Sequence, residues 1–130
     1  MEILSSRVLL RPVNLPETQA FYRDVLGLAI AREFGTVEHR GVVFFLGNGL
    51  LEVAGSRAAV EQSSLVLWLQ VRDVQAELLR LAGLGVTISR EARTEPWGLI
   101  EGWIRDPDGT KIVLVQVPAD HPIRRDVREI

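Results

Sequence analysis

The pattern of apolar and polar positions predicts two helices and eight strands. The first helix is predicted from Glu17 to Leu26, where apolar side chains recur at the spacing of one helical face. The second follows Asp73, whose carboxylate can cap it, and has apolar side chains at the same spacing. Apolar runs of strand length are found at Arg7 to Val13, Leu28 to Phe34, Gly41 to Leu46, Leu50 to Ala54, Leu65 to Val71, Val86 to Ser89, Trp97 to Arg105 and Thr110 to Val117.

The predicted order of strand, helix and three strands occurs twice. Asn14 and Asp73 precede the two helices and are 59 residues apart. Gly27 and Gly85 follow the helices and are 58 residues apart. A repeat of this length predicts an α+β fold of two βαβββ modules, in which eight mixed strands curve around a cleft and the two helices lie outside.

The repeat also predicts how the chain is divided. We expect residues 1–118 to form one domain, with modules at about 1–55 and 64–118. Ser56 to Ser63 is polar and small, and is expected to link the modules. After Pro118 the sequence becomes charged, so residues 119–130 are expected to form a tail.

The composition excludes several kinds of protein. The net charge is -2 and the arginines are scattered, so we expect no nucleic-acid partner. No apolar stretch approaches the roughly 20 residues of a membrane span, and the first residues lack the pattern of a signal peptide. A cytoplasmic location is the default expectation. The absence of cysteine excludes disulfides and thiolate sites.

Several segments match one known superfamily. They are Phe21 to Leu28 after the first strand, Val71 to Val74 before the second helix, Pro96 to Gly98, and Asp106 to Gly109 before the last strand. The chain resembles the vicinal oxygen chelate superfamily, which includes glyoxalase I, the extradiol dioxygenases and the bleomycin-resistance proteins. The resemblance implies a glyoxalase-like fold and a homodimer, because relatives build their clefts across subunits. It does not determine the activity, because one fold hosts many chemistries.

The resemblance also implies where a metal would bind. In the metal-using members a divalent cation is held by His or Glu side chains of the first, fourth, fifth and eighth strands. The matching positions here are Arg7, Glu52, Val66 and Val113. Of these, Glu52 alone is a metal-binding residue type, and divalent metals need about three protein donors. We therefore expect no metal and no cofactor.

Strand alternation predicts which other side chains share a face with these four positions. Aromatic walls with a few charged groups suit a planar or polar organic ligand. The predicted cavity residues are Arg7, Arg11, Glu52, Trp68, Gln70, Glu101, Trp103 and Lys111.

Most of these residues also have a structural interpretation. Trp68 and Trp103 could belong to the core or to a dimer interface. Arg7 and Glu52 could form an ion pair that fills the metal position. Glu101 is more often a solvated residue than a catalytic one.

Other chemistry-bearing residues are expected to be structural. His39 and His121 are interpreted as surface or loop histidines, and Trp97 as a residue that plugs a loop. Asp106 and Asp108 resemble paired carboxylates but belong to an Asp-Pro-Asp-Gly turn.

The resulting hypothesis is a metal-free small-molecule binding protein of the bleomycin-resistance type, which sequesters an aromatic or heteroaromatic ligand. The alternative is a divergent metal-dependent lyase, isomerase or dioxygenase that uses Glu52 with His39 or a ligand from another strand. A third possibility is metal-free acid–base catalysis by Glu52 or Glu101. A fourth is a purely structural or regulatory dimer.

Overall fold

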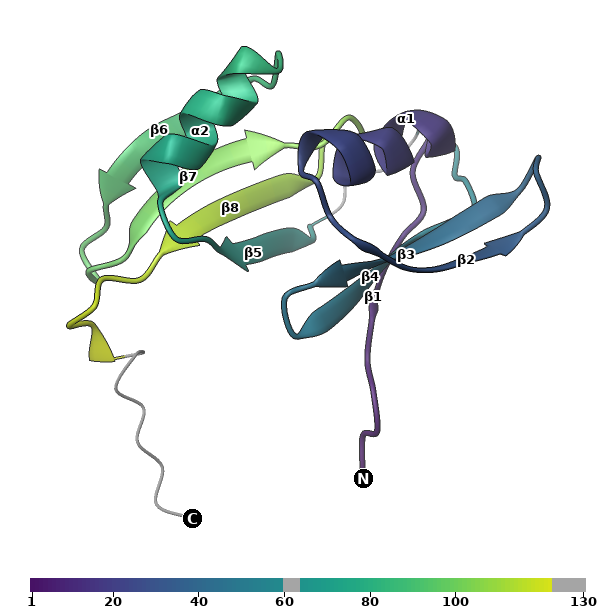
Figure 1. Cartoon of the computed structure of the whole chain (residues 1–130), viewed down its shortest axis with the longest axis horizontal. Coiled ribbons are helices and arrows are strands. Elements are labelled where there is room, and N and C mark those ends of the chain that lie inside the picture. Colours follow the sequence, from purple (N-terminus) through teal and green to yellow (C-terminus); the bar gives the residue numbers. More distant parts are fainter. Residues whose placement is uncertain (60–63, 123–130) are drawn as a thin grey trace. The chain divides into compact units, whose positions relative to one another are not determined.

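The computed structural model describes residues 1–59 and 64–122. Contacts within the chain divide it into two units. Unit 1 comprises Met1–Ser63 with Asp106–Gly109, and unit 2 comprises Ser64–Arg105 with Thr110–Ile130. Each unit contains a four-stranded sheet and a helical segment that covers one face of that sheet (Figure 1).

Unit 1 contains the first helix and the first four strands. Its sheet has the order β1-β4-β3-β2, in which β1 is parallel to β4 and the other pairs are antiparallel. The elements are β1 (Val8–Leu10), α1 (Leu15–Ala20), a π-helical turn η1 (Phe21–Val25), β2 (Ile30–Gly35), β3 (Arg40–Leu46) and β4 (Gly49–Val53).

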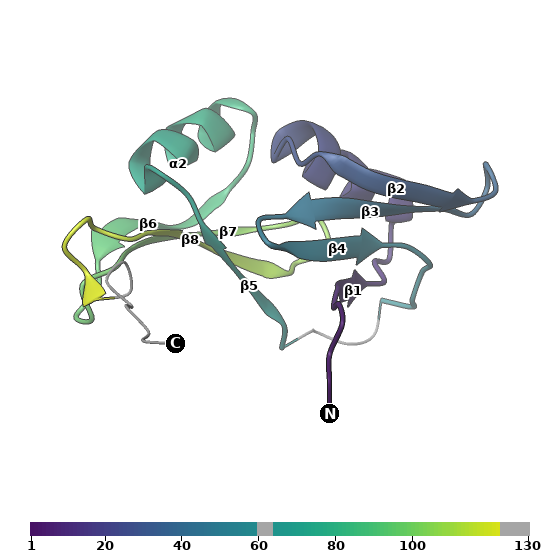
Figure 2. The same ribbon diagram turned by 60° about the horizontal axis from the view of Figure 1, so that its bottom comes forward.

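Unit 2 repeats this arrangement. Its sheet has the order β5-β8-β7-β6, again with one parallel pair, β5 with β8. Figure 2 shows α2 lying above this sheet. The elements are β5 (Val66–Gln70), α2 (Val74–Gly83), β6 (Ile88–Thr94), β7 (Ile100–Arg105) and β8 (Lys111–Gln116).

The structure confirms the predicted α+β fold and the twofold order of elements. Some predicted bounds are wrong. The first strand is only three residues long, and β6 extends to Thr94 instead of ending at Ser89. The strand predicted from Trp97 begins only at Ile100, because Gly98 closes a turn by donating its N–H to the Glu95 carbonyl.

The first helix differs from the prediction in its second half. Asn14 accepts a hydrogen bond from the Glu17 N–H and caps α1 as Asp73 caps α2. After Ala20 the helix changes to the π-helical pattern, in which each N–H donates to the carbonyl five residues earlier, as the Leu26 N–H does to the Phe21 carbonyl. The chain then leaves the helix at Gly27, whose φ of 72° is the left-handed conformation that glycine favours.

Much of the core of each unit lies between its sheet and its helical segment, and unit 2 has a further buried cluster of Leu99, Val113, Val115 and Val117. In unit 1, Phe44 and Leu51 are fully buried, and the Gln19 amide donates to the Arg40 and Val53 carbonyls. In unit 2 the helix lies close to Gly102: a Cβ there would be 2.6 Å from the Leu78 side chain. Side chains on the helix-covered faces therefore stabilise the fold and are not available to a ligand.

Neither α1 nor α2 has the length and hydrophobicity needed to cross a membrane, in the part of the chain that the structure describes.

Candidate functional site: the helix-free sheet faces

Most of the predicted site residues lie on the sheet faces that the helices leave uncovered. In unit 1, Leu9 is opposite Glu52, and Glu52 is opposite Val43. Paired residues point to the same face of a sheet. Their neighbours in sequence, such as Leu51, are buried on the helix side. Glu52 is therefore on the helix-free face of unit 1.

Arg7 and Glu52 form the ion pair that was one of the two predicted alternatives. The Arg7 Nη1 atom lies 2.9 Å from Glu52 Oε1, and the Glu52 side chain is only 17% exposed. The carboxylate thus already accepts a charge-assisted hydrogen bond from a guanidinium.

The residues at the superfamily's metal-ligand positions do not fit a metal ion. A cation beside Glu52 would meet the positive charge of Arg7. Within residues 1–59 and 64–122, no three His, Asp or Glu side chains are grouped so that they could hold an ion. Val66 and Val113 offer no lone pair.

The structure does not bring Arg11 or His39 to Glu52. Arg11 follows the end of β1, and its guanidinium lies beside Gly55. His39 lies just before β3, four residues before Val43, which is opposite Glu52, so their backbone positions are roughly 13 Å apart for an extended chain. It lines an open pocket of about 520 Å³ together with Asn14, Gln19 and Ser56. The predicted pairing of Glu52 with His39 is therefore not supported by the register.

Unit 2 brings the other predicted residues onto a single face. Trp68 is opposite Val113, Val113 is opposite Trp103, and Trp103 is opposite Arg90, so these four form one row across the sheet. We call this helix-free surface the tryptophan face. It also carries Gln70, Val115, Glu101, Lys111 and Val66.

The two tryptophans on this face have different environments. Trp68 is 50% exposed. The Trp103 ring is covered by the Arg90 guanidinium, 3.9 Å from its centroid, and by the Lys111 ammonium, 3.6 Å from its centroid. These cations come from the strands on either side of β7. Trp103 therefore packs against the protein's own side chains, whereas Trp68 offers an accessible ring.

Glu101 is buried, so its interpretation as a solvated residue is wrong. It is 7% exposed and accepts a hydrogen bond of 2.9 Å from the Trp97 indole N–H. Trp97 itself is 58% exposed in the turn before β7. Its carbonyl contacts the His121 Nε2 atom at 2.8 Å, as expected for a loop histidine with a hydrogen-bond partner.

Glu95 is a buried charge that the sequence analysis missed. It forms ion pairs with Arg90 and Arg93. Burial raises the pKa of Glu95, but the hydrogen bonds from the two arginines outweigh burial and hold its pKa below the usual value. The one sequence signal for these ion pairs is the closeness of Arg90 and Arg93 to Glu95 in the Thr-Glu-Pro turn.

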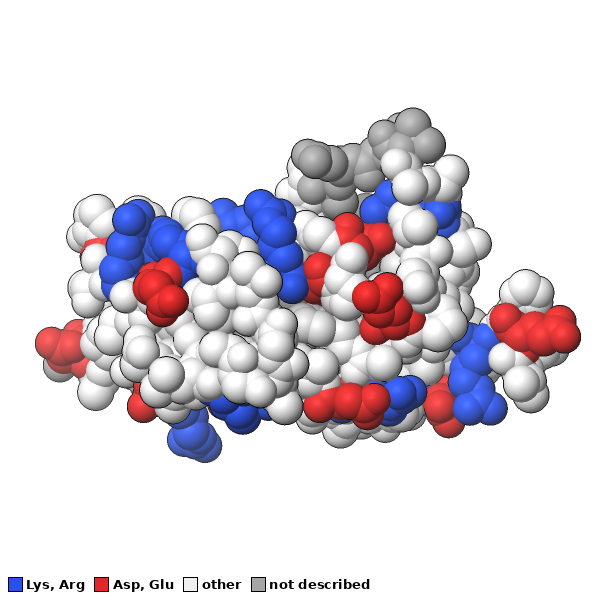
Figure 3. Space-filling model, turned by 90° about the horizontal axis from the view of Figure 1, so that it is seen from above, with Lys and Arg blue, Asp and Glu red and all other residues white. Residues whose placement is uncertain are grey.

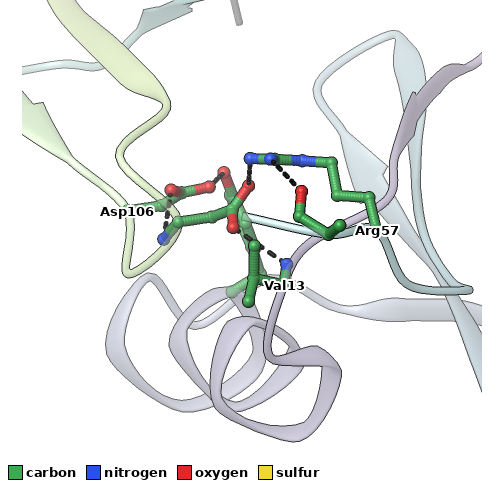
Figure 4. Close-up of polar contacts among 6 residues, drawn as sticks. Val13, Arg57 and Asp106 are labelled. Atoms are coloured by element: carbon green, nitrogen blue, oxygen red, sulfur yellow. Dashed lines mark hydrogen bonds and ion pairs between the residues drawn. The ribbon is translucent and has the colours of Figure 1, made fainter. Parts of the chain in front are cut away.

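The Asp106–Gly109 turn is a structural element of unit 1 (Figure 4). Asp106 accepts a 2.7 Å hydrogen bond from the Tyr22 hydroxyl, and Asp108 accepts bonds from the Val13 N–H and from Arg57. Burial and the nearby Asp106 charge raise the pKa of Tyr22 far above its usual value, so this hydroxyl remains a donor. The structural interpretation of both carboxylates is consistent with these bonds.

Charges of both signs are mixed on the surface drawn in Figure 3. Blue and red side chains lie beside one another, and no continuous basic stripe crosses that face. The view agrees with the net charge of -2.

Comparison with known proteins identifies the superfamily. Residues 5–114 match the Glyoxalase/Bleomycin resistance protein/Dioxygenase superfamily. No curated protein sequence matches the chain. The fold is similar to that of solved structures at low sequence identity. TnmS3, an antibiotic binding protein from Streptomyces sp. CB03234, is 22% identical, with a TM-score of 0.74 over 90% of this chain and 98% of TnmS3. Lactoylglutathione lyase from Agrobacterium tumefaciens is also 22% identical, with a TM-score of 0.68 over 85% of this chain and 90% of the lyase.

Proposed function

The chain belongs to the Glyoxalase/Bleomycin resistance protein/Dioxygenase superfamily, and from this membership we propose that it binds a small aromatic or heteroaromatic molecule without a metal ion. In this proposal the ligand is sequestered and not chemically changed. The fold alone cannot distinguish binding from catalysis, so the proposal depends on the side chains of the two helix-free faces.

The observation that carries the proposal is the ion pair between Arg7 and Glu52. It supports a metal-free protein because the one suitable donor among the superfamily's ligand positions is neutralised by a cation of the chain itself. Removing Arg7 would leave a single carboxylate, which is too few donors for a divalent ion.

The tryptophan face supports an aromatic ligand. Trp68 is half exposed, so a planar ring could stack on its indole. The similarity in fold to an antibiotic binding protein supports a small-molecule ligand more generally.

Intrinsic tryptophan fluorescence provides the first test. We expect planar aromatic compounds, beginning with naphthalene derivatives, to quench the fluorescence of the purified chain with saturable curves. We also expect metal analysis to find zinc, nickel, iron and manganese far below one equivalent. A stoichiometric, tightly bound metal would instead favour the alternative, a divergent metal-dependent lyase, isomerase or dioxygenase.

The single domain of residues 1–118 and the homodimer also remain proposals. Exposed apolar side chains on the sheet strands, including Leu9 and Phe45, provide support for a covered interface. Light scattering at the mass of one chain would contradict the homodimer. Two separated unfolding transitions would contradict the single domain.

A further inference from the structure

Lys111 is the single lysine of the chain, among 14 arginines, and it lies on the tryptophan face. Its ammonium group is 3.6 Å from the Trp103 ring centroid. Within the described part of the chain, no carboxylate lies within ion-pair distance of this group, whereas Arg90 and Arg93 on β6 are paired with Glu95. Among the described residues, this face therefore holds a cation with no carboxylate partner.

The same face has further donors without acceptors. The Trp103 Nε1 and Arg90 Nε atoms are buried and have no hydrogen-bond partner among the described residues. The buried acceptors are engaged, because Glu101 accepts from Trp97 and Glu95 accepts from two arginines. Unpaired buried donors are costly, and both N–H groups add positive electrostatic potential to this face.

Trp103 holds the lysine in position. The Lys111 side chain lies against the indole, and Arg90 covers the ring as well, so few orientations remain for the ammonium group. A fixed cation loses less conformational entropy on binding an anion than a freely moving one does.

Trp68 lies diagonally from Lys111 on the parallel pair of β5 and β8. Trp68 is opposite Val113, and Lys111 is two residues before Val113 on the same face. Strand geometry places the two backbone positions about 8 Å apart. This separation fits one molecule that stacks a ring on Trp68 and extends a charged group to Lys111.

We infer that the tryptophan face selects planar aromatic anions, with the ring on Trp68 and the anionic group on the Lys111 ammonium. This inference rests on the proposed function and adds the charge of the ligand to it. Opposite charges in a partly desolvated site attract strongly, whereas a ligand cation would be repelled by Lys111.

Three probes of one shape test the charge: 2-naphthoate, 2-naphthylmethanol and 2-naphthylmethylammonium. Their dissociation constants are measured by tryptophan quenching at low and high salt. We expect 2-naphthoate to bind about tenfold more tightly than the neutral alcohol, the cation to bind most weakly, and the difference to shrink at high salt.

Substitutions of Lys111 test whether the preference for 2-naphthoate arises at this residue. Lys111→Met keeps the packing against Trp103 and should remove the preference for 2-naphthoate, while Lys111→Arg should largely restore it. Arg80→Met is the matched control, because it removes one positive charge from the exposed side of α2. Thermal melting of each variant establishes that it is folded.

The outcomes separate the two proposals. If the alcohol and 2-naphthoate bind equally, and Lys111→Met changes neither, this inference is overturned while aromatic binding stands. If Arg80→Met abolishes the preference as fully as Lys111→Met, the preference reflects net charge and the inference is again overturned. If none of the three probes binds, both proposals fail.

Discussion

The two units share one topology but use their helix-free faces differently. In each sheet the first strand of the unit pairs in parallel with its last strand. The helix of unit 1 is capped by Asn14 and the helix of unit 2 by Asp73. At matching register positions, unit 1 has Leu9 opposite Glu52, whereas unit 2 has Trp68 opposite Val113. The same backbone therefore carries an ion pair in one unit and an accessible aromatic ring in the other.

This difference indicates that the polar contacts of unit 1 serve stability, whereas the exposed face of unit 2 is the better candidate for ligand binding. Arg7 is paired with Glu52, Arg57 with Asp108, and Tyr22 with Asp106, all within unit 1. Unit 2 has its own paired charges around Glu95 but leaves Trp68 half exposed. We therefore expect changes in the polar contacts of unit 1 to affect stability, and changes on the tryptophan face to affect ligand binding.

The largest expected effect is on the stability of unit 1. Tyr22→Phe removes the donor that binds the buried Asp106 carboxylate and should lower the unfolding free energy by about 2–3 kcal/mol. Urea denaturation measures this change. Tyr22 is fully buried, and Phe preserves the ring packing, so an unchanged midpoint would show that the hydroxyl does not hold the turn.

Ligand binding should depend on Trp68 and not on an equally exposed aromatic residue of unit 1. Trp68→Ala should weaken binding of 2-naphthoate by tenfold or more, about 1.4 kcal/mol, through the loss of stacking. Phe45, which is 52% exposed on β3, provides the matched control. Titrations with both variants make the comparison, and equal losses for Phe45→Ala and Trp68→Ala would contradict the division of roles.

Acid should weaken unit 2 through Glu95. Because the folded-state pKa of Glu95 is lowered, its ion pairs stabilise the fold above the ordinary value of 4.5, and this contribution is lost as the pH falls through the folded pKa. The difference in unfolding free energy between wild type and Glu95→Gln should therefore shrink on acidification. Denaturation at a series of pH values tests this. Glu91→Gln, at an exposed position of β6, should show a smaller change with pH.

The smallest expected effect comes from the ion pair of unit 1. Arg7 is 37% exposed, so solvent screens its attraction to Glu52, and Arg7→Met should cost no more than about 1 kcal/mol. A double-mutant cycle with Glu52→Gln isolates the coupling energy. If Arg7→Met made the chain bind stoichiometric metal, the ion pair would be a removable block on a working metal site.

The sequence determined the parts of this protein that depend on local patterns. The periodicity of apolar residues predicted both helices and all eight strands, and the repeat predicted two modules of one topology. The helix caps at Asn14 and Asp73 could also be predicted from the sequence. Alternation along the strands also placed Trp68, Gln70, Glu101 and Trp103 on one face. These features follow from neighbouring residues, because backbone geometry fixes which side chains share a face.

Only the tertiary structure decided which of those side chains remain accessible. The covering of Trp103 by Arg90 and Lys111, the burial of Glu101, and the pairing of Arg7 with Glu52 all depend on contacts between different segments of the chain. Long charged side chains can reach several neighbours on a sheet, and their choice depends on burial and on competing partners, which no local pattern records.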